Sequence, residues 1–352
     1  MPSTSGYSAI DRLFHRLALS SRVAGELFFD VENVMHGRDC QDVRDGAHVI
    51  VSGLARAGTT ILMRMLHDAG SFASLTYRDM PLVMAPNLWH GVVKRFQKSS
   101  ERTERAHGDG VMVDFDSPEA LEEVFWRTFC GPDYIGSRVL RPMRASQEVI
   151  DHYRRYVSLI LKRHNRSRYL AKNNNSTVRF PSIVKAFPNA TIIVPFRHPI
   201  AQASSLLAQH RNFIKRHEQD SFSRCYMDWL AHYEFGTNHR RFVFDAAERG
   251  EFEDPLNVSY WLDLWLDFYR YAIQQAEILG HSIMFFSYER LVSDPSTVRE
   301  RLFDRLGLEP SAPLEVRQRL VGLSLPAMGD RPDLQATYED LTARADRALS
   351  MP

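Results

Sequence analysis

Residues 48–60 read HVIVSGLARAGTT, an apolar run followed by a loop with two glycines and then by two threonines. The run over 48–51 is typical of a short buried strand, and the residues from Thr59 to Ala69 show the apolar pattern of a helix. Amide N–H groups at the start of a helix point toward an anion, and glycine lets that anion approach the backbone closely. The stretch therefore predicts an α/β fold that binds a phosphate-like group after its first strand.

This loop differs from the phosphate loop of nucleoside triphosphatases. Those proteins place Gly-Lys before Ser or Thr, so that the lysine meets the outer phosphates and the hydroxyl holds magnesium. Here Gly58 is followed directly by Thr59, and the positive charge of the loop comes from Arg56. A glycine turn before a helix also occurs for purely structural reasons, so a phosphate site needs a second signal.

Strands and helices alternate along the rest of the chain. The sequence predicts strands at 169–172, 191–196 and 283–286, helices over 147–164, 180–187 and 258–279, and further helices that begin at Pro199 and Pro295. This alternation implies a mostly parallel sheet that is covered by helices on both faces. Ligands of such sheets bind at the carboxyl ends of the strands, where we expect the loop 53–60, Lys172 and Arg197.

Three other segments carry local signals. Apolar residues recur at intervals of three, four or seven between Ile10 and Val34, which predicts an amphipathic helical region with a packing role. Ser117 and Pro118 predict the N-cap and the first residue of a helix that runs to about Phe129. The charged, glycine-containing segment 99–110 predicts a mobile loop of the kind that forms lids.

The second anion signal is Arg197-His198-Pro199, which directly follows the strand at 191–196 and precedes Ser204 and Ser205 in the next helix. A magnesium-dependent phosphotransferase favours a carboxylate at a strand end, because the carboxylate ligates the metal. An arginine instead suits a terminal phosphate, since its planar guanidinium makes paired, charge-assisted hydrogen bonds. A surface arginine paired with an acid is the alternative interpretation of Arg197.

Together these two segments resemble the sulfotransferases that use 3′-phosphoadenosine 5′-phosphosulfate. The turn at 58–60 resembles the 5′-phosphosulfate loop of that family, and Arg197 with Ser205 resembles its 3′-phosphate site. Further similarity lies in Lys172 and in the motif Ser287-Tyr288-Glu289-Arg290-Leu291, so that the resemblance covers roughly residues 49–308. The loop here has Ala55, Arg56 and Ala57 where the family more often has Pro, a cation and Ser, and His198 stands where Asp is common.

The resemblance implies a P-loop NTPase-like three-layer α/β sandwich with a central, mostly parallel sheet and helical insertions. It implies a single domain: an N-terminal helical extension (1–47), a donor-binding core (48–308) with a helical and lid insertion (77–165), and a C-terminal tail (309–352). The donor-binding residues that it implies are Arg56, Ala57, Gly58, Thr59, Thr60, Arg197, Ser205 and Tyr288. Arg56 and Lys172 would stabilise the charge that develops on the leaving phosphate, without a metal.

The general base is less well defined by the sequence. Family members often carry a carboxylate or a histidine after the first helix, where Asp79 is the first candidate here, and His107 in the expected lid is the second. Glu122 and Glu123 offer either one carboxylate facing the cleft or two that solvate a helix. The tryptophans Trp89, Trp126, Trp261 and Trp265 could line an acceptor pocket, although large aromatic residues at helical spacing usually form core.

The amino-acid composition argues against several classes of binding partner and cofactor. Lys and Arg total 44 against 43 for Asp and Glu, so the net charge of +1 gives no reason to expect nucleic-acid binding. The 3 cysteines form no Cys-x-x-Cys pair, which argues against a zinc or disulfide framework. The polar start of the sequence lacks a signal core and no apolar run is long enough to span a membrane, so a cytoplasmic protein is the expectation.

The leading hypothesis is therefore transfer of a sulfuryl group from 3′-phosphoadenosine 5′-phosphosulfate to a hydroxyl or amine of a small-molecule or carbohydrate acceptor, with adenosine 3′,5′-bisphosphate as the product. A P-loop kinase or other phosphotransferase, and a catalytically silent nucleotide-binding protein, are the alternatives. The sequence does not define the acceptor or the oligomeric state.

Overall fold

A central parallel sheet organises the computed structural model, which describes residues 8–93, 103–104, 112–113, 118–245, 252–309 and 331–350. Its five strands lie in the order β2, β6, β1, β7, β9. Every neighbouring pair is parallel. The strands are β1 (Val49–Val51), β2 (Phe72–Ala73), β6 (Arg168–Lys172), β7 (Thr191–Phe196) and β9 (Ile283–Ser287).

Helices cover both faces of this sheet and form two hydrophobic cores. Because side chains alternate along a strand, Ile50 and Ile192 face one core and Val49 and Ile193 face the other. The first core includes residues of α6 (Gln147–His164), α7 (Phe180–Ala186) and α10 (Val258–Leu279). The second includes residues of α3 (Thr59–His67) and α12 (Pro295–Leu306). The predicted three-layer α/β architecture is therefore confirmed.

The predicted elements occur where the sequence placed them, with one exception. α6 and α10 have the predicted bounds, and α8 (Pro199–Gln219) and α12 begin at the predicted prolines. The helix expected to start at Pro118 is wrong: α5 spans Glu123–Tyr134. Pro118 instead forms an antiparallel bridge with Thr76, and the amide of Glu119 donates to the carbonyl of Leu75. This extended segment brings Glu119 to the edge of the sheet.

The N-terminal region forms α1 (Ala9–Leu19) and α2 (Arg22–His36), as predicted, but most of the apolar residues that the spacing selected do not pack in the core of the chain. The recurring apolar residues are exposed, whereas Phe29 and Glu32 of α2 are buried. Glu32 accepts hydrogen bonds from the amides of Asn87 and Leu88 at the start of α4 (Pro86–Val93). The interior beside α2 thus contains the first N–H groups of α4, which need an acceptor from outside their own helix. A carboxylate provides that acceptor and an aliphatic side chain cannot.

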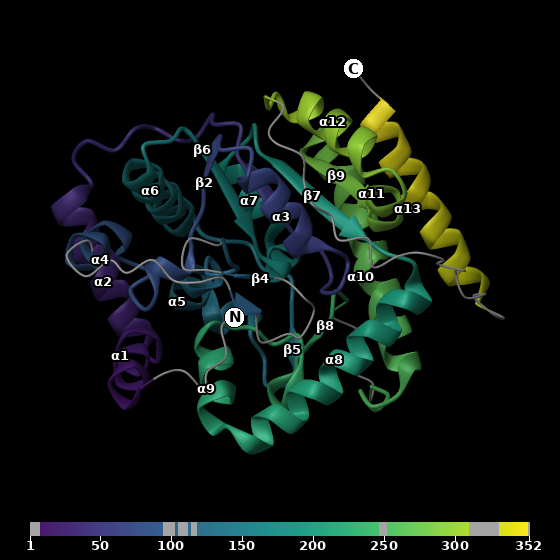
Figure 1. Ribbon diagram of the computed structural model, residues 1–352, viewed down its shortest axis with the longest axis horizontal. Helices are drawn as coiled ribbons and strands as arrows, with labels where there is room; N and C mark the ends of the chain where they lie inside the picture. The colour runs from purple at the N-terminus through teal and green to yellow at the C-terminus, as the bar shows by residue number, and fades with distance from the viewer. Residues whose placement is uncertain are drawn as a thin grey trace.

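Shorter elements complete the described chain. They are η2 (Tyr77–Asp79), β3 (Thr103–Glu104), β4 (Met112–Val113), β5 (Val139–Leu140), η4 (Asn174–Arg179), α9 (Ser221–Trp229), η5 (Gly236–Asn238), β8 (Arg241–Phe242), η6 (Gly280–Ser282), α11 (Tyr288–Ser293) and α13 (Pro332–Ser350). The C-terminal helix α13 packs beside β9 (Figure 1). Of the expected lid 99–110, only β3 lies within the described residues, and the division into 1–47, 48–308 and 309–352 stays a prediction. No helix in the described ranges combines the length and apolarity that crossing a membrane requires.

Candidate active site

The loop after β1 adopts the conformation that its glycine predicts. Gly58 is the N-cap of α3, in the left-handed region with φ 84° and ψ 13°, and it provides no capping side chain. The first amides of α3 have no intrahelical acceptor, so the start of the helix is suited to an anion. A Cβ atom built on Gly58 would lie 2.6 Å from Cδ2 of Tyr288. Glycine is therefore required here for both conformation and space.

We expect Gly58→Ala to lower the free energy of unfolding more than Gly70→Ala does. Both glycines have a positive φ, but Gly70 has no atom within 4 Å of a built Cβ. The control should lose about 1–2 kcal/mol from its left-handed backbone alone, while Gly58→Ala adds the collision with the ring of Tyr288. Chemical denaturation of the two variants measures the difference. In a Tyr288→Ala background the two losses should become equal; if they still differ, the contact is not the cause.

The two sequence motifs meet in the structure. Arg56 Nε donates to Ser205 Oγ at 3.1 Å, which joins the first loop to α8. Gln202, fully buried on α8, joins them a second time: its Nε2 donates to the carbonyls of Leu54 and Ala55 at 3.2 and 3.0 Å. Its Oε1 accepts from the amide of Arg197 at 3.2 Å. One side chain thus fixes the 53–60 loop against the end of β7.

Tyr288 completes this arrangement at the end of β9. The guanidinium of Arg197 lies over its ring, 5.0 Å from the centroid. The same ring lies beside Gly58. Arg197 forms no ion pair with a carboxylate among the described residues, which does not support the alternative of a surface arginine paired with an acid. His198 is buried and packs against the ring of Tyr338, while its amide donates to Glu289 at 2.9 Å.

Lys172 and Glu119 face each other in a cavity of about 50 Å³ beside the loop. Lys172 Nζ lies 4.0 Å from Glu119 Oε1, and both side chains are buried. The second oxygen of Glu119 accepts from the hydroxyl of Tyr77 at 2.5 Å. The cavity is lined by Ala55, Arg56, Thr59, Thr60, Glu119, Lys172, Asn174, Phe213, Met227, His232, Glu234 and Phe235. Arg56, Thr59, Thr60 and Lys172 were all selected from the sequence, so four of the predicted site residues share one cavity.

His232 is a candidate base that the sequence analysis missed. It lines the cavity, and its Nε2 lies 2.8 Å from the carbonyl oxygen of Ala120. A carbonyl only accepts, so Nε2 carries the proton and Nδ1 of the neutral ring is an acceptor. No periodicity or motif marks His232, because its place depends on the contact with Ala120, in the segment between Pro118 and α5. No such signal marks Glu119 either.

A model of the sulfotransferase family matches residues 48–249, which is more than half of the chain. The chain belongs to the sulfotransferase family. Among curated protein sequences, none matches this sulfotransferase.

Solved structures share the architecture at low identity. A sulfotransferase from Mycobacterium tuberculosis, STF1, is 13% identical, with 97% of this chain and 88% of that chain covered and a TM-score of 0.50. The corresponding values for STF9 from Mycobacterium avium are 13%, 97%, 79% and 0.48. A sulfotransferase from Alicyclobacillus acidocaldarius is 14% identical, with 87% and 96% covered and a TM-score of 0.41. At such identities the match to STF1 shows a common fold and nothing finer.

Asp79, the first candidate for the general base, is not part of the candidate active site of this chain. It is fully buried in η2, where its Oδ2 accepts from the amide and the hydroxyl of Thr76 and its Oδ1 pairs with Arg163. It does not line the Lys172 cavity. These contacts give Asp79 a structural role, and we assign it none in the reaction proposed below. His107, the second candidate, lies outside the described residues.

Both interpretations of Glu122 and Glu123 are wrong, because each side chain is only 1% exposed. Glu122 accepts hydrogen bonds from Trp126, Tyr153 and Tyr169, and burial raises its pKa. Glu123 binds Nη2 of Arg179 through both carboxylate oxygens, at 2.8 and 2.7 Å. The tryptophans Trp126, Trp261 and Trp265 are buried core residues, as expected, and none of them lines the Lys172 cavity.

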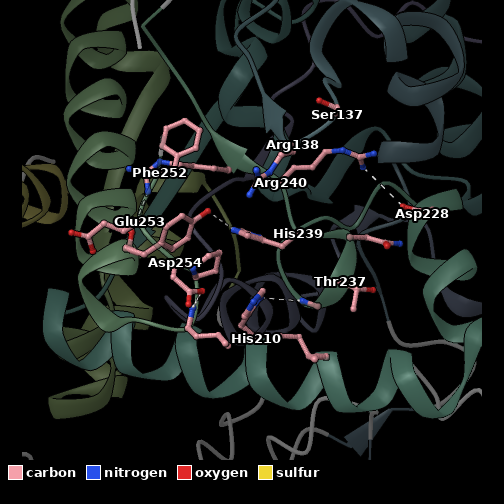
Figure 2. A pocket seen from close by; sticks show the side chains of 17 residues that line it. Ser137, Arg138, His210, Asp228, Thr237, His239, Arg240, Phe252, Glu253 and Asp254 are labelled. Atoms are coloured by element: carbon pink, nitrogen blue, oxygen red, sulfur yellow. Dashed lines mark hydrogen bonds and ion pairs between the residues drawn. The ribbon is translucent and has the colours of Figure 1, made fainter. Parts of the chain in front are cut away.

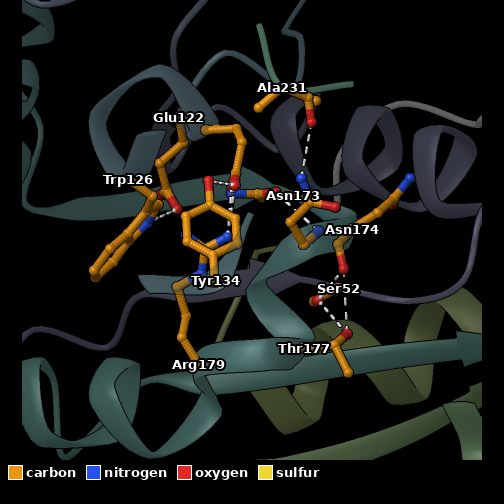
Figure 3. A network of polar contacts seen from close by, with 12 residues as sticks. Ser52, Glu122, Trp126, Tyr134, Asn173, Asn174, Thr177, Arg179 and Ala231 are labelled. Carbon is orange, nitrogen blue, oxygen red and sulfur yellow. Dashed lines mark hydrogen bonds and ion pairs between the residues drawn. The ribbon is translucent and has the colours of Figure 1, made fainter. Parts of the chain in front are cut away.

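The buried Glu123–Arg179 pair belongs to a polar network that reaches the residue after Lys172, and Figure 3 shows Trp126, Tyr134, Asn173 and Arg179 of this network. Asn173, the next residue, donates to Glu123 Oε2 at 2.6 Å, and the ring faces of Trp126 and Tyr134 lie against the Arg179 guanidinium. Removing one partner of such a pair would leave a buried, uncompensated charge. The network therefore fixes the backbone directly after Lys172 without being accessible to a ligand.

A second, larger cavity of about 490 Å³ is lined by residues of the 236–241 and 252–256 segments together with His210 of α8 (Figure 2). None of the residues selected from the sequence lines it. Two of the arginines that line this cavity have an acidic partner. Arg241 pairs with Asp267, and Arg240 lies 4.0 Å from Asp228. Burial lowers the pKa of His210 to about 4 and that of His239 to about 3, so both rings are neutral at pH 7.

These two histidines predict a loss of stability in mild acid. Their folded-state pKa values lie below the unfolded value of about 6.5, so the unfolded chain binds more protons and stability falls as the pH drops from 6.5 toward 4. Between pH 7 and pH 5 each should cost about 2 kcal/mol of unfolding free energy. Denaturation titrations at several pH values test this. His210→Gln should flatten the dependence, and a slope equal to that of the wild type would contradict the assignment.

Proposed function

We propose that this sulfotransferase uses 3′-phosphoadenosine 5′-phosphosulfate as its donor and transfers the sulfuryl group in line to a hydroxyl or amine, without a metal. The observation that supports this most directly is the junction of the two anion-binding segments. Arg56 contacts Ser205, and Gln202 connects the loop to the Arg197 backbone. A ligand with phosphate groups at two ends, such as a bisphosphorylated adenosine, fits two such anchor points that lie side by side.

The chemical groups of these residues suit the phosphates and the adenosine of this donor. The start of α3, with Thr59 and Thr60, would hold the 5′-phosphosulfate through backbone amides and hydroxyls. Arg197 and Ser205 would hold the 3′-phosphate, and the exposed part of the Tyr288 ring offers a flat surface beside both motifs. The donor supplies the sulfuryl group to be transferred. Every other role in the proposed reaction is assigned to side chains of this protein.

Transfer breaks the bond between sulfur and the bridging phosphate oxygen, and the electron pair stays on that oxygen. Lys172 and Arg56 both line the cavity and would stabilise the developing negative charge. The acceptor oxygen or nitrogen forms the new bond to sulfur and loses a proton. We assign that proton to Nδ1 of His232, because Nε2 is held by the carbonyl of Ala120 and the ring faces the cavity.

The acceptor would enter past Phe213, Met227 and Phe235, the apolar part of the cavity wall. A small-molecule or carbohydrate acceptor stays a proposal, as does a cytoplasmic location. Transfer of labelled sulfate from the donor to panels of alcohols, phenols, amines and sugars identifies the class of acceptor. The same assay on His232→Gln tests the base: turnover should fall about 10²–10⁴-fold with little change in donor affinity.

Calorimetry with adenosine 3′,5′-bisphosphate tests the donor assignment. We expect binding that is unaffected by a chelator and stronger than the binding of ATP with magnesium. A preference for ATP with magnesium would instead establish a phosphotransferase. Donor binding without turnover across the whole acceptor panel would favour the silent nucleotide-binding protein.

A further inference from the structure

The exposed apolar surface of the protein is concentrated on its first two helices. Within the described chain 13 large apolar side chains are exposed, and 9 of them belong to α1 and α2. α1 exposes Ile10, Leu13, Phe14 and Leu17, and α2 exposes Val23, Leu27, Val31, Val34 and Met35. The two helices lie at one edge of the molecule, away from β9 and α13 (Figure 1). Single exposed apolar residues are ordinary, whereas such a concentration of them commonly marks an interaction surface.

The inner side of α2 packs closely against α4 and α5. These contacts hold the helix in place and thereby fix its outer side. A Cβ atom on Gly25 would lie 2.7 Å from Oγ1 of Thr128, which shows how closely α2 approaches α5. Phe29 packs edge-to-face on Phe125 and Phe129. Glu32 caps α4 through two backbone amides. These contacts fix which residues of α2 face outward, and a preorganised surface loses little conformational freedom on association.

The outward residues of α2 are spaced so that the row can pack against the same row of a second copy. Val23, Leu27, Val31 and Met35 follow one another at intervals of four, and such rows form the ridges by which helices most often pack together. Two copies of α2 related by a two-fold axis near Phe29 would place Leu27 of one copy against Val31 of the other. The same axis would place Val23 against Met35. A two-fold contact requires a patch that matches itself in this way.

Charge and area favour a second copy of the chain over a lipid surface. α1 and α2 carry three arginines and no lysine against four acidic residues, so these helices have no excess of positive charge. An interfacial helix that binds anionic lipid is rich in Lys and Arg instead. A large aliphatic side chain presents roughly 100 Å² when exposed, so nine at about half exposure offer roughly 500 Å² per copy. Two copies with a polar rim approach the ~1,600 Å² of a standard interface.

We propose that α2, flanked by the apolar row of α1, is the contact surface of a two-fold symmetric dimer of this protein. The proposal is independent of the donor and of the reaction. It explains why helical spacing selected Leu27, Val31 and Val34 as packing residues although they do not pack within one chain.

Light scattering coupled to size exclusion tests the dimer. The wild-type chain should elute at twice its 40.6 kDa. An acidic variant (Leu27→Glu with Val31→Glu) and a basic variant (Leu27→Lys with Val31→Lys) should each elute as a monomer. An equimolar mixture of the two should regain the dimer mass, because each glutamate then faces a lysine. Circular dichroism and thermal unfolding check that both variants fold, which their exposed positions favour.

Ile278→Glu is the matched control, since Ile278 is 68% exposed on α10, outside the proposed surface. It should leave the mass unchanged. A wild-type protein that stays monomeric at all accessible concentrations overturns the proposal, as does a dimer that persists in both charged variants. A monomer that floats with phosphatidylcholine vesicles, and loses this property in the acidic variant, overturns it in favour of a lipid surface.

Discussion

Arg197→Ala is expected to weaken the binding of adenosine 3′,5′-bisphosphate by about 10²–10⁴-fold. Hydrogen bonds to charged groups contribute about 1.5–3 kcal/mol each, and a guanidinium can make two of them to one phosphate. Arg197 is held for this purpose: its carbonyl accepts from Trp265 at 3.1 Å and its amide donates to Gln202. Its guanidinium lies on the ring of Tyr288 and is not paired with a carboxylate of the described chain.

Isothermal calorimetry measures this effect, with Arg270→Ala as the control. Arg270 is an exposed arginine on α10, so its loss should leave the affinity for the bisphosphate unchanged. Adenosine 5′-monophosphate provides a second comparison, because it lacks the 3′-phosphate. It should bind wild-type protein and Arg197→Ala with similar affinity. If the variant loses affinity for both nucleotides equally, or for neither, Arg197 does not recognise the 3′-phosphate.

The regular elements were predictable because their signals are local. α6 has Ser146 as its N-cap and Asn165 in the left-handed conformation at its C-cap, and both residue types are typical of those positions. α8 and α12 have proline in the first turn, which fixes a helical φ. The buried parallel strands were also predictable. Because helices cover both faces of the sheet, each strand appears in the sequence as a continuous apolar run.

The candidate site was only partly predictable, because half of it depends on contacts between distant segments. The loop at 56–60 and Arg197 follow strands directly, so that the topology itself brings them to one edge of the sheet. Glu119 reaches that edge because its neighbour Pro118 bridges Thr76 and its own amide donates to Leu75, and His232 is held there by the carbonyl of Ala120. Gln202, which connects the two motifs, looks like any polar residue of an amphipathic helix.

The misassigned residues show the limits of periodicity. A spacing of three and four identifies one side of a helix but not what covers it, and on α2 that side faces solvent. Glu122 and Glu123 look like solvated charges in the sequence. Their partners are tyrosines, a tryptophan and Arg179, of which Tyr153, Tyr169 and Arg179 lie 31 to 56 residues away. A buried carboxylate needs such partners, and the sequence does not reveal them.

Lys172→Ala should reduce turnover about 10²–10³-fold while changing donor affinity by less than tenfold. The reason is that the charge which Lys172 would stabilise appears on the leaving phosphate oxygen in the transition state and not in the bound donor. The lysine is positioned for this by β6, by the Asn173–Glu123 hydrogen bond behind it and by Glu119 beside it. Single-turnover kinetics and calorimetry measure the two quantities separately.

Two controls separate this charge effect from a loss of structure. Lys185→Ala removes an exposed lysine from α7 and should change neither quantity. Lys172→Ala leaves Glu119 buried without its cation, which by itself can disturb the cavity, so Lys172→Met with Glu119→Gln removes both charges together. If Lys172 acts on the transition state, the double variant stays as slow as the single one although its stability recovers. If turnover recovers with stability, Lys172 only maintains the cavity; and if affinity falls as much as turnover, the lysine binds the donor in its ground state.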